Sequence, residues 1–75
     1  MLAYVFVNLN VPAEKELVQE FIGMPEVKDA HILFGEWDLI LKISGKNSED
    51  IASFVIDKVR SLEEVNLSST LIVAK

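Results

Sequence analysis

The fold is decided by the stretch Val27–Ser44, VKDAHILFGEWDLILKIS. Two runs rich in apolar residues, Val27–Phe34 and Trp37–Ser44, flank the dipeptide Gly35-Glu36. A two-residue connection with glycine first is typical of a type II′ turn, whose backbone twist matches that of antiparallel strands. The stretch therefore predicts a β-hairpin in the middle of the chain, with a positive φ angle at Gly35.

The segments on either side of the hairpin repeat one pattern of strand and helix. Branched and aromatic residues fill both alternating faces of the first strand, as in a central strand covered on both sides. Helix starts and stops are indicated by proline, capping residues and glycine. We predict a strand at Leu2–Leu9, followed by a helix that begins at Pro12, with Asn10 or Val11 as its cap, and stops at Gly23. After the hairpin strands comes a second helix, capped by Asn47 or Ser48, and then a final strand at Val65–Ala74. The buried stripe of the second helix is predicted to be Ile51, Phe54, Val55, Val59 and Leu62.

The order βαββαβ predicts an α+β fold of the ferredoxin-like type. Right-handed crossovers would place both helices on one face of a four-stranded antiparallel sheet. The opposite face then has no cover, although the first strand is apolar on both sides, with Ala3, Val5, Val7 and Leu9 on one and Leu2, Tyr4 and Phe6 on the other. Packing two such sheets face to face across a two-fold axis covers these side chains. We therefore expect a dimeric α+β barrel formed by sheet-face packing.

Composition also favours self-association. A single domain of 75 residues with 51% hydrophobic residues buries a core that is marginal for a monomer. Small domains are commonly reinforced by disulfides, metals or oligomerisation, and this chain has no cysteine and one histidine. Oligomerisation is the remaining route.

Charge and hydropathy limit the partners. Seven basic and twelve acidic residues give a net charge of −5, and no run of Lys or Arg occurs, which argues against direct contact with nucleic acid. The apolar segment Met1–Val7 has no basic residue before it, and Asn8 and Asn10 end it well short of a signal peptide or a membrane span. We expect a cytoplasmic protein without membrane contact.

Few residues could carry catalysis. His31 is the only imidazole, and neither a second histidine nor a cysteine is present to complete a metal or nucleophile site. The serines have no Gly-x-Ser-x-Gly context, and the three glycines are too scattered to cradle a phosphate. We expect no metal, no cofactor and an ordinary strand role for His31.

One group of residues does favour a ligand. Gly35, Trp37 and Asp38 lie within four positions of the hairpin, and the last strand carries the hydroxyl triplet Ser68-Ser69-Thr70. Asp38 could pair with an α-ammonium group, amides beside Gly35 could meet an α-carboxylate, and apolar neighbours could hold a side chain. The alternative is a plain turn in which Asp38 is solvated.

The hairpin, the following helix and the last strand EEVNLSSTLIV resemble the ligand-binding (RAM) domain of the Lrp/AsnC transcription regulators. Trp37 stands where tyrosine is commoner in that family, and Glu64 where glycine is usual. The resemblance covers essentially the whole chain. The positions that carry it are Val27, Gly35, Trp37, Asp38, Leu39, Phe54, Val55, Val65, Ser68, Thr70, Ile72 and Val73.

The resemblance implies sheet-face dimers, rings such as octamers or decamers, and small effectors, typically amino acids, bound between dimers near the hairpin. It also implies a stand-alone RAM domain over residues 1–75, because the helix-turn-helix domain of full-length regulators is not in this sequence. Such a chain is expected to act without enzyme activity, by binding an apolar amino acid at Gly35, Trp37, Asp38, Ser68, Ser69 and Thr70 and by mixing with full-length regulators.

Two alternatives remain open at this point. One is a small enzyme on the same dimeric architecture, of the monooxygenase or isomerase kind, in which His31 would be needed for turnover. The other is an interaction module that binds no ligand.

Overall fold

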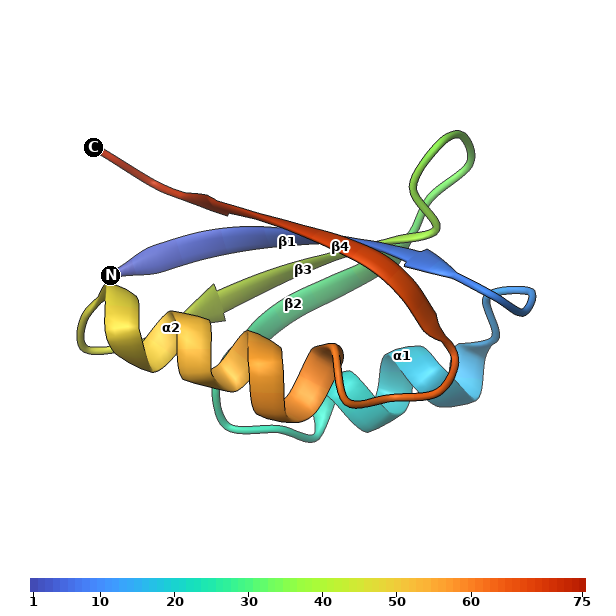
Figure 1. Ribbon diagram of the computed structural model, residues 1–75, viewed down its shortest axis with the longest axis horizontal. Coiled ribbons are helices and arrows are strands. Elements are labelled where there is room, and N and C mark those ends of the chain that lie inside the picture. Colours follow the sequence, from blue (N-terminus) through green and yellow to red (C-terminus); the bar gives the residue numbers. More distant parts are fainter.

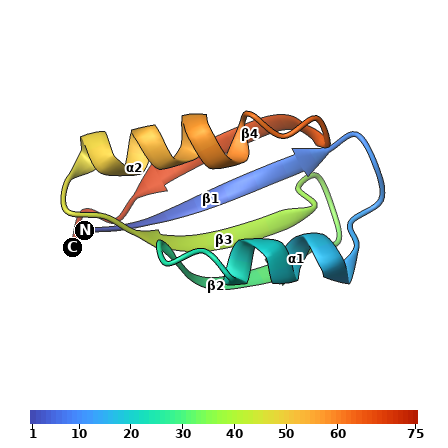
Figure 2. The same ribbon diagram turned by 90° about the horizontal axis from the view of Figure 1, so that it is seen from below.

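The computed structural model describes residues 1–75 and shows a four-stranded antiparallel sheet with both helices on one face (Figures 1 and 2). This arrangement confirms the predicted βαββαβ order. None of the helices has the length and hydropathy that a membrane-spanning helix requires. The elements are β1 (Leu2–Leu9), α1 (Lys15–Ile22), β2 (Val27–Ile32), β3 (Leu39–Ser44), α2 (Ser48–Phe54), the π-helical segment η1 (Val55–Val59) and β4 (Val65–Ile72).

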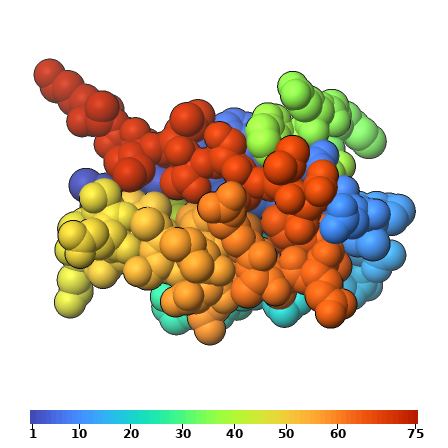
Figure 3. Space-filling model, in the orientation of Figure 1, coloured from blue at the N-terminus to red at the C-terminus, as the bar shows by residue number.

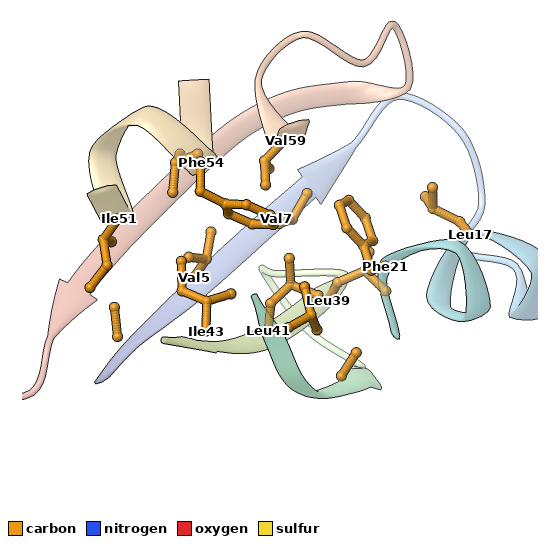
Figure 4. Packing of buried hydrophobic residues seen from close by; sticks show 14 of the residues in the cluster. Val5, Val7, Leu17, Phe21, Leu39, Leu41, Ile43, Ile51, Phe54 and Val59 are labelled. Atoms are coloured by element: carbon orange, nitrogen blue, oxygen red, sulfur yellow. The ribbon is translucent and has the colours of Figure 1, made fainter. Parts of the chain in front are cut away.

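The strand order is β2-β3-β1-β4, so the first strand lies in the middle of the sheet, as its composition predicts. Alternate residues of β1, including Ala3, Val5 and Val7, are fully buried on the helix side. They pack with side chains from β3 and both helices, and burial of each large aliphatic or aromatic side chain contributes about 1.5–3 kcal/mol (Figure 4). The largest fully buried side chains are Phe21, Leu39, Leu41, Ile43, Ile51, Val5, Val7 and Val59.

The first helix begins later than the sequence predicts. Its N-cap is Glu14, not Asn10 or Val11, and Pro12 precedes the helix. Asn10 does not cap this helix, because its hydrogen bonds go to residues that precede β4. Its backbone N–H donates to the Glu64 carbonyl at 2.7 Å, and its side-chain amide donates to the Glu63 carbonyl at 3.1 Å. These long-range bonds hold Asn10 beside the start of β4. The predicted stop at Gly23 is confirmed.

The second helix begins as predicted. The Asn47 side chain accepts a hydrogen bond from the Asp50 backbone N–H at 2.9 Å, which satisfies one of the free donors of the first turn. The helix then widens into η1, which the sequence pattern did not indicate. The predicted stripe is confirmed, since Ile51, Phe54, Val55 and Val59 are buried and Leu62 packs against the core.

The hairpin connection is longer than the predicted two-residue turn. β2 ends at Ile32 and β3 begins at Leu39, and the Leu33 N–H donates to the Asp38 carbonyl at 2.8 Å. Phe34–Trp37 therefore form the tip of a loop. Gly35 has the predicted positive φ, 134°. The last strand is also shorter than predicted, ending at Ile72 instead of Ala74.

The face of the sheet opposite the helices is uncovered, and we call it the open face (Figure 1). Tyr4 is 36% exposed and Leu71, its partner across the strands, is 56% exposed. Polar residues share this face on the β2–β3 side. By strand register, the residues of the open face are Leu2, Tyr4, Phe6, Asn8, Asp29, His31, Ile40, Lys42, Ser44, Leu67, Ser69 and Leu71.

Candidate functional site

The segment Leu33–Asp38, which we call the hairpin loop, is fastened to the end of the central strand. Its closing bond joins Leu33 to Asp38, and the Asp38 N–H donates to the Val7 carbonyl at 2.9 Å. The loop rises from the sheet on the side away from the helices (Figure 1). Its base is therefore fixed, while its tip projects beyond the open face.

The Asp38 carboxylate holds a β-bulge in place. The register of β1 against β4 shifts between Asn8 and Leu9, and the Leu9 N–H donates to Asp38 Oδ2 at 2.7 Å. The Asn8 side-chain amide donates to the same oxygen at 3.4 Å. A carboxylate has about four acceptor positions, so Oδ1, which receives no bond from the protein, can still accept one. The half-buried Asp38 thus has a structural role and retains binding capacity.

Two asparagines that sequence reasoning missed extend this network. Asn8 donates from Nδ2 to the Glu36 carbonyl at 3.2 Å and accepts at Oδ1 from Asn66 Nδ2 at 2.9 Å. Together they connect β1, β4 and the hairpin loop. The available signal was the position of Asn8, which interrupts the apolar alternation of Leu2, Tyr4 and Phe6.

Trp37 forms an aromatic wall beside this network. Its ring lies against Phe6, with centroids 5.9 Å apart and planes inclined by 42°. Such a tilted pair contributes about 0.5–1.5 kcal/mol beyond its burial. This contact turns Trp37 toward the open face, which helps explain why β3 begins two residues after it.

The structure separates the hydroxyl triplet. Ser69 lies opposite Phe6 and shares the open face with Trp37. Ser68 and Thr70 lie opposite Val7 and Val5 and therefore face the helix layer. The structure brings Gly35, Trp37 and Asp38 together, with Ser69 on the same face, and places Ser68 and Thr70 on the other.

His31 is separate from the hairpin site. It lines a shallow pocket of about 270 Å³ on the open face together with Tyr4, Asp29, Ile40 and Lys42. His31 Nε2 lies 3.1 Å from Asp29 Oδ2. The hydrogen bond from His31, followed by that from the Ala30 N–H, lowers the pKa of Asp29. No cluster of three or more metal-ligating side chains occurs in the structure.

The lowered pKa of Asp29 predicts a pH dependence of stability. A depressed carboxyl pKa stabilises the fold above its unfolded value, ordinarily 3.8, and this contribution is lost as pH falls through the folded value. Asp29→Asn should therefore melt slightly below the wild type near about pH 5, and the gap should close toward about pH 2. Thermal melts across this range measure it. A gap that widens on acidification would contradict the assignment.

The sequence of this chain is similar to part of several transcription regulators. Residues 2–75 match the family model described as the Lrp/AsnC ligand binding domain. An uncharacterized HTH-type transcriptional regulator of Pyrococcus horikoshii is 36% identical over 59 residues, covering 79% of this chain and 39% of that protein. The HTH-type transcriptional regulator FL11 of Pyrococcus furiosus is 31% identical over all 75 residues, covering 49% of its own length. The chain thus spans between two fifths and one half of these relatives.

Solved structures share the fold. FFRP-DM1 superposes with a TM-score of 0.87 at 32% identity, over 96% of both chains. A transcriptional regulator of Neisseria meningitidis, solved as a complex with L-Met, superposes with a TM-score of 0.78 at 24% identity, over 99% of this chain and 49% of that one. The regulators named here give no support to the enzyme alternative. The chain belongs to the Lrp/AsnC ligand-binding domain family.

Proposed function

We propose that the chain, a single domain over residues 1–75, is a non-enzymatic module that binds an apolar amino acid at the hairpin loop. The observation that carries this proposal is the Asp38 carboxylate. Bonds from Leu9 and Asn8 fix its Oδ2 and leave Oδ1 without a protein partner. A carboxylate held in one orientation binds an ammonium group without first losing side-chain freedom.

The neighbours of Asp38 match the other groups of an amino acid. Gly35 has a positive φ and no atom within 4 Å of where a side chain would begin, so a carboxylate can approach its backbone amides. Trp37 and Phe6 offer apolar surface to the ligand's side chain, and Ser69 offers a hydroxyl on the same face. The L-Met complex of the Neisseria meningitidis regulator supports this ligand class. Apolar residues such as leucine, isoleucine, valine and methionine are the proposed effectors.

Ser68 and Thr70 enter the proposal differently. Both face the helix layer, so neither meets a ligand above the open face of its own chain. We propose that they contribute only where a second copy brings its hairpin loop to this side of the sheet. Self-association is therefore part of the proposed site.

The first proposed self-association uses the open face. Four strands about 4.8 Å apart and about 20–26 Å long cover roughly 400–500 Å² in projection, and side-chain relief increases the accessible area. The area of the open face is therefore of the same order as the roughly 800 Å² that each partner buries in a stable interface. The apolar side chains of the face, such as Tyr4 and Leu71, supply the driving force. We also propose that such dimers assemble into rings and that the chain assembles together with full-length regulators.

A thermal-shift screen with the common amino acids tests ligand binding. A ligand at 100 times its dissociation constant adds about 2.7 kcal/mol, which corresponds to about 10–20 °C for a domain of this size. We expect apolar amino acids to raise the melting temperature, and their N-acetyl and amide derivatives, which lack one charged group, to raise it much less. No shift from any amino acid at millimolar concentration would overturn the proposal.

Co-assembly has a separate test. Mixed with a full-length regulator of the family, the chain should form hetero-oligomers visible by native mass spectrometry. Without that regulator it should not shift duplex DNA, because its net charge is −5. Only homo-oligomers in the mixture would overturn co-assembly and leave amino-acid binding standing.

A further inference from the structure

The four titratable residues of the open face lie together on one part of it. In a row across the sheet, Asp29 on β2 lies opposite Lys42 on β3, and Lys42 lies opposite Tyr4 on β1. His31 follows Asp29 by two positions and therefore shares its face. We call Tyr4, Asp29, His31 and Lys42 the His31 cluster. The edge strand β4 adds no titratable group to this face, since its residues there are Leu67, Ser69 and Leu71.

The His31 cluster surrounds a hollow that reaches the middle of the sheet. The hollow measures about 270 Å³, and Ile40 completes its lining. Tyr4 belongs to the inner strand β1, so a second sheet packed on the open face also covers the hollow. Figure 3 shows no part of the chain above the sheet between the C-terminal end, in red, and the hairpin loop, in green. The cluster is therefore open to water in a single copy and enclosed in the proposed dimer.

The protonation state of His31 decides the net charge of the cluster. With a neutral imidazole, the Asp29 carboxylate and the Lys42 ammonium cancel. With a protonated imidazole, each cluster has two positive groups and one negative group. The negative group is then engaged, because Asp29 Oδ2 lies 3.1 Å from His31 Nε2, whereas Lys42 forms no ion pair. The acidic residues of the hairpin loop, Glu36 and Asp38, do not line the hollow and so do not offset the added charge there.

We propose that His31 is a pH sensor of the open-face dimer, which forms with His31 neutral and is weakened when His31 is protonated. This inference rests on the sheet-face dimer of the proposed function. In that dimer two clusters are enclosed together, and with both imidazoles protonated they hold four positive groups against two negative ones. Unmatched charges are costly to remove from water, and like charges repel. Histidine is the side chain whose charge ordinarily changes between about pH 5 and pH 8, so the switch operates near neutral pH.

Proton linkage gives the direction of the effect. The separated copies bind protons at His31 that the dimer excludes, so dissociation takes up two protons at most, one for each copy. The dissociation constant therefore rises as pH falls, by at most about 100-fold for each pH unit. The hydrogen bond from His31 lowers the pKa of Asp29, so this carboxylate stays ionised throughout the range. We expect the dissociation constant to be at least about tenfold higher near about pH 5.5 than near about pH 7.5.

Two substitutions fix His31 in one charge state each. His31→Gln is neutral at both pH values, and its amide can still donate to Asp29, so the assembly should persist unchanged near about pH 5.5. His31→Lys is positive at both pH values and should dissociate at both, as the wild type does in acid. Sedimentation of the full chain over a dilution series measures each dissociation constant, and circular dichroism of the same samples reports folding. If dissociation unfolds the wild type in acid, His31→Gln should remain both assembled and folded there.

Two results would overturn the sensor. One is a wild type with the same dissociation constant at both pH values, and the other is a His31→Gln variant that keeps the full pH dependence. Tyr4→Asp near about pH 7.5 tests the underlying dimer separately. If it leaves the mass of the assembly unchanged, the sheet-face dimer of the proposed function is wrong and the sensor with it. If it lowers the mass while the wild type shows no pH dependence, only the sensor is wrong.

Discussion

Tyr4→Asp should break the sheet-face dimer, so that the mass of the assembly falls below that of the wild type at micromolar concentration. Tyr4 lies in the central strand on the open face, between Lys42 on one neighbouring strand and Leu71 on the other. In a face-to-face dimer the new carboxylate would be buried in both copies, at a cost of several kcal/mol. With about 1.4 kcal/mol per decade, at least about 3 kcal/mol corresponds to a dissociation constant raised more than 100-fold.

The variant is chosen so that the monomer tolerates it. In a single copy the introduced carboxylate would be solvent-exposed beside the Lys42 ammonium, so the sheet itself loses little. Leu71→Asp on β4 should give the same result from a second position, and Ile22→Asp on α1 serves as the matched control away from the face. Sedimentation with circular dichroism measures mass and folding together. If both open-face variants keep the wild-type mass, the sheet-face dimer is wrong.

Asp38 variants should lose amino-acid binding. Truncating one partner of a buried charge pair costs about 2–5 kcal/mol, so Asp38→Ala should weaken binding by about 30-fold to several thousand-fold. Alanine also leaves the Leu9 N–H without its acceptor, which loosens the bulge and the loop. The alanine variant alone therefore does not separate binding from folding.

Asp38→Asn makes that separation. Its side-chain carbonyl can still accept from Leu9, but the negative charge is gone, so we expect a wild-type fold with a binding loss close to that of alanine. His31→Ala, in a different pocket, should bind as the wild type does. Calorimetry with the best amino acid of the screen, beside far-ultraviolet circular dichroism, compares the three variants. If Asp38→Asn binds the amino acid with wild-type affinity, the Asp38 carboxylate has a structural role only and does not bind the ligand.

Local sequence signals predicted most of the fold. The apolar run Leu2–Leu9 gives a strand with the predicted bounds, and Asn47 caps its helix, because both depend on neighbouring residues. The predicted starts of α1 and β3 are wrong because contacts with residues distant in sequence determine them. Asn10 bonds to residues before β4 instead of capping α1, and Trp37 packs on Phe6 instead of extending β3.

The candidate site was predicted only in part for the same reason. Gly35, Trp37 and Asp38 are neighbours in sequence, so their proximity follows from the hairpin. The bond from Leu9 to Asp38 and the link through Asn8 to Asn66 depend on strand pairing, which a sequence pattern does not specify. The split of Ser68 and Thr70 from Ser69 follows from strand alternation alone and could have been deduced.

A crystal structure grown with the amino acid that most raises the melting temperature tests the central claim most directly. We predict that the amino acid lies at the hairpin loop, with its ammonium group about 2.7–2.9 Å from the Asp38 carboxylate and its carboxylate against the amides beside Gly35. Asp38 should keep its bond to the Leu9 N–H in the same crystal. An amino acid bound elsewhere, with the hairpin loop empty in every copy, would contradict the account.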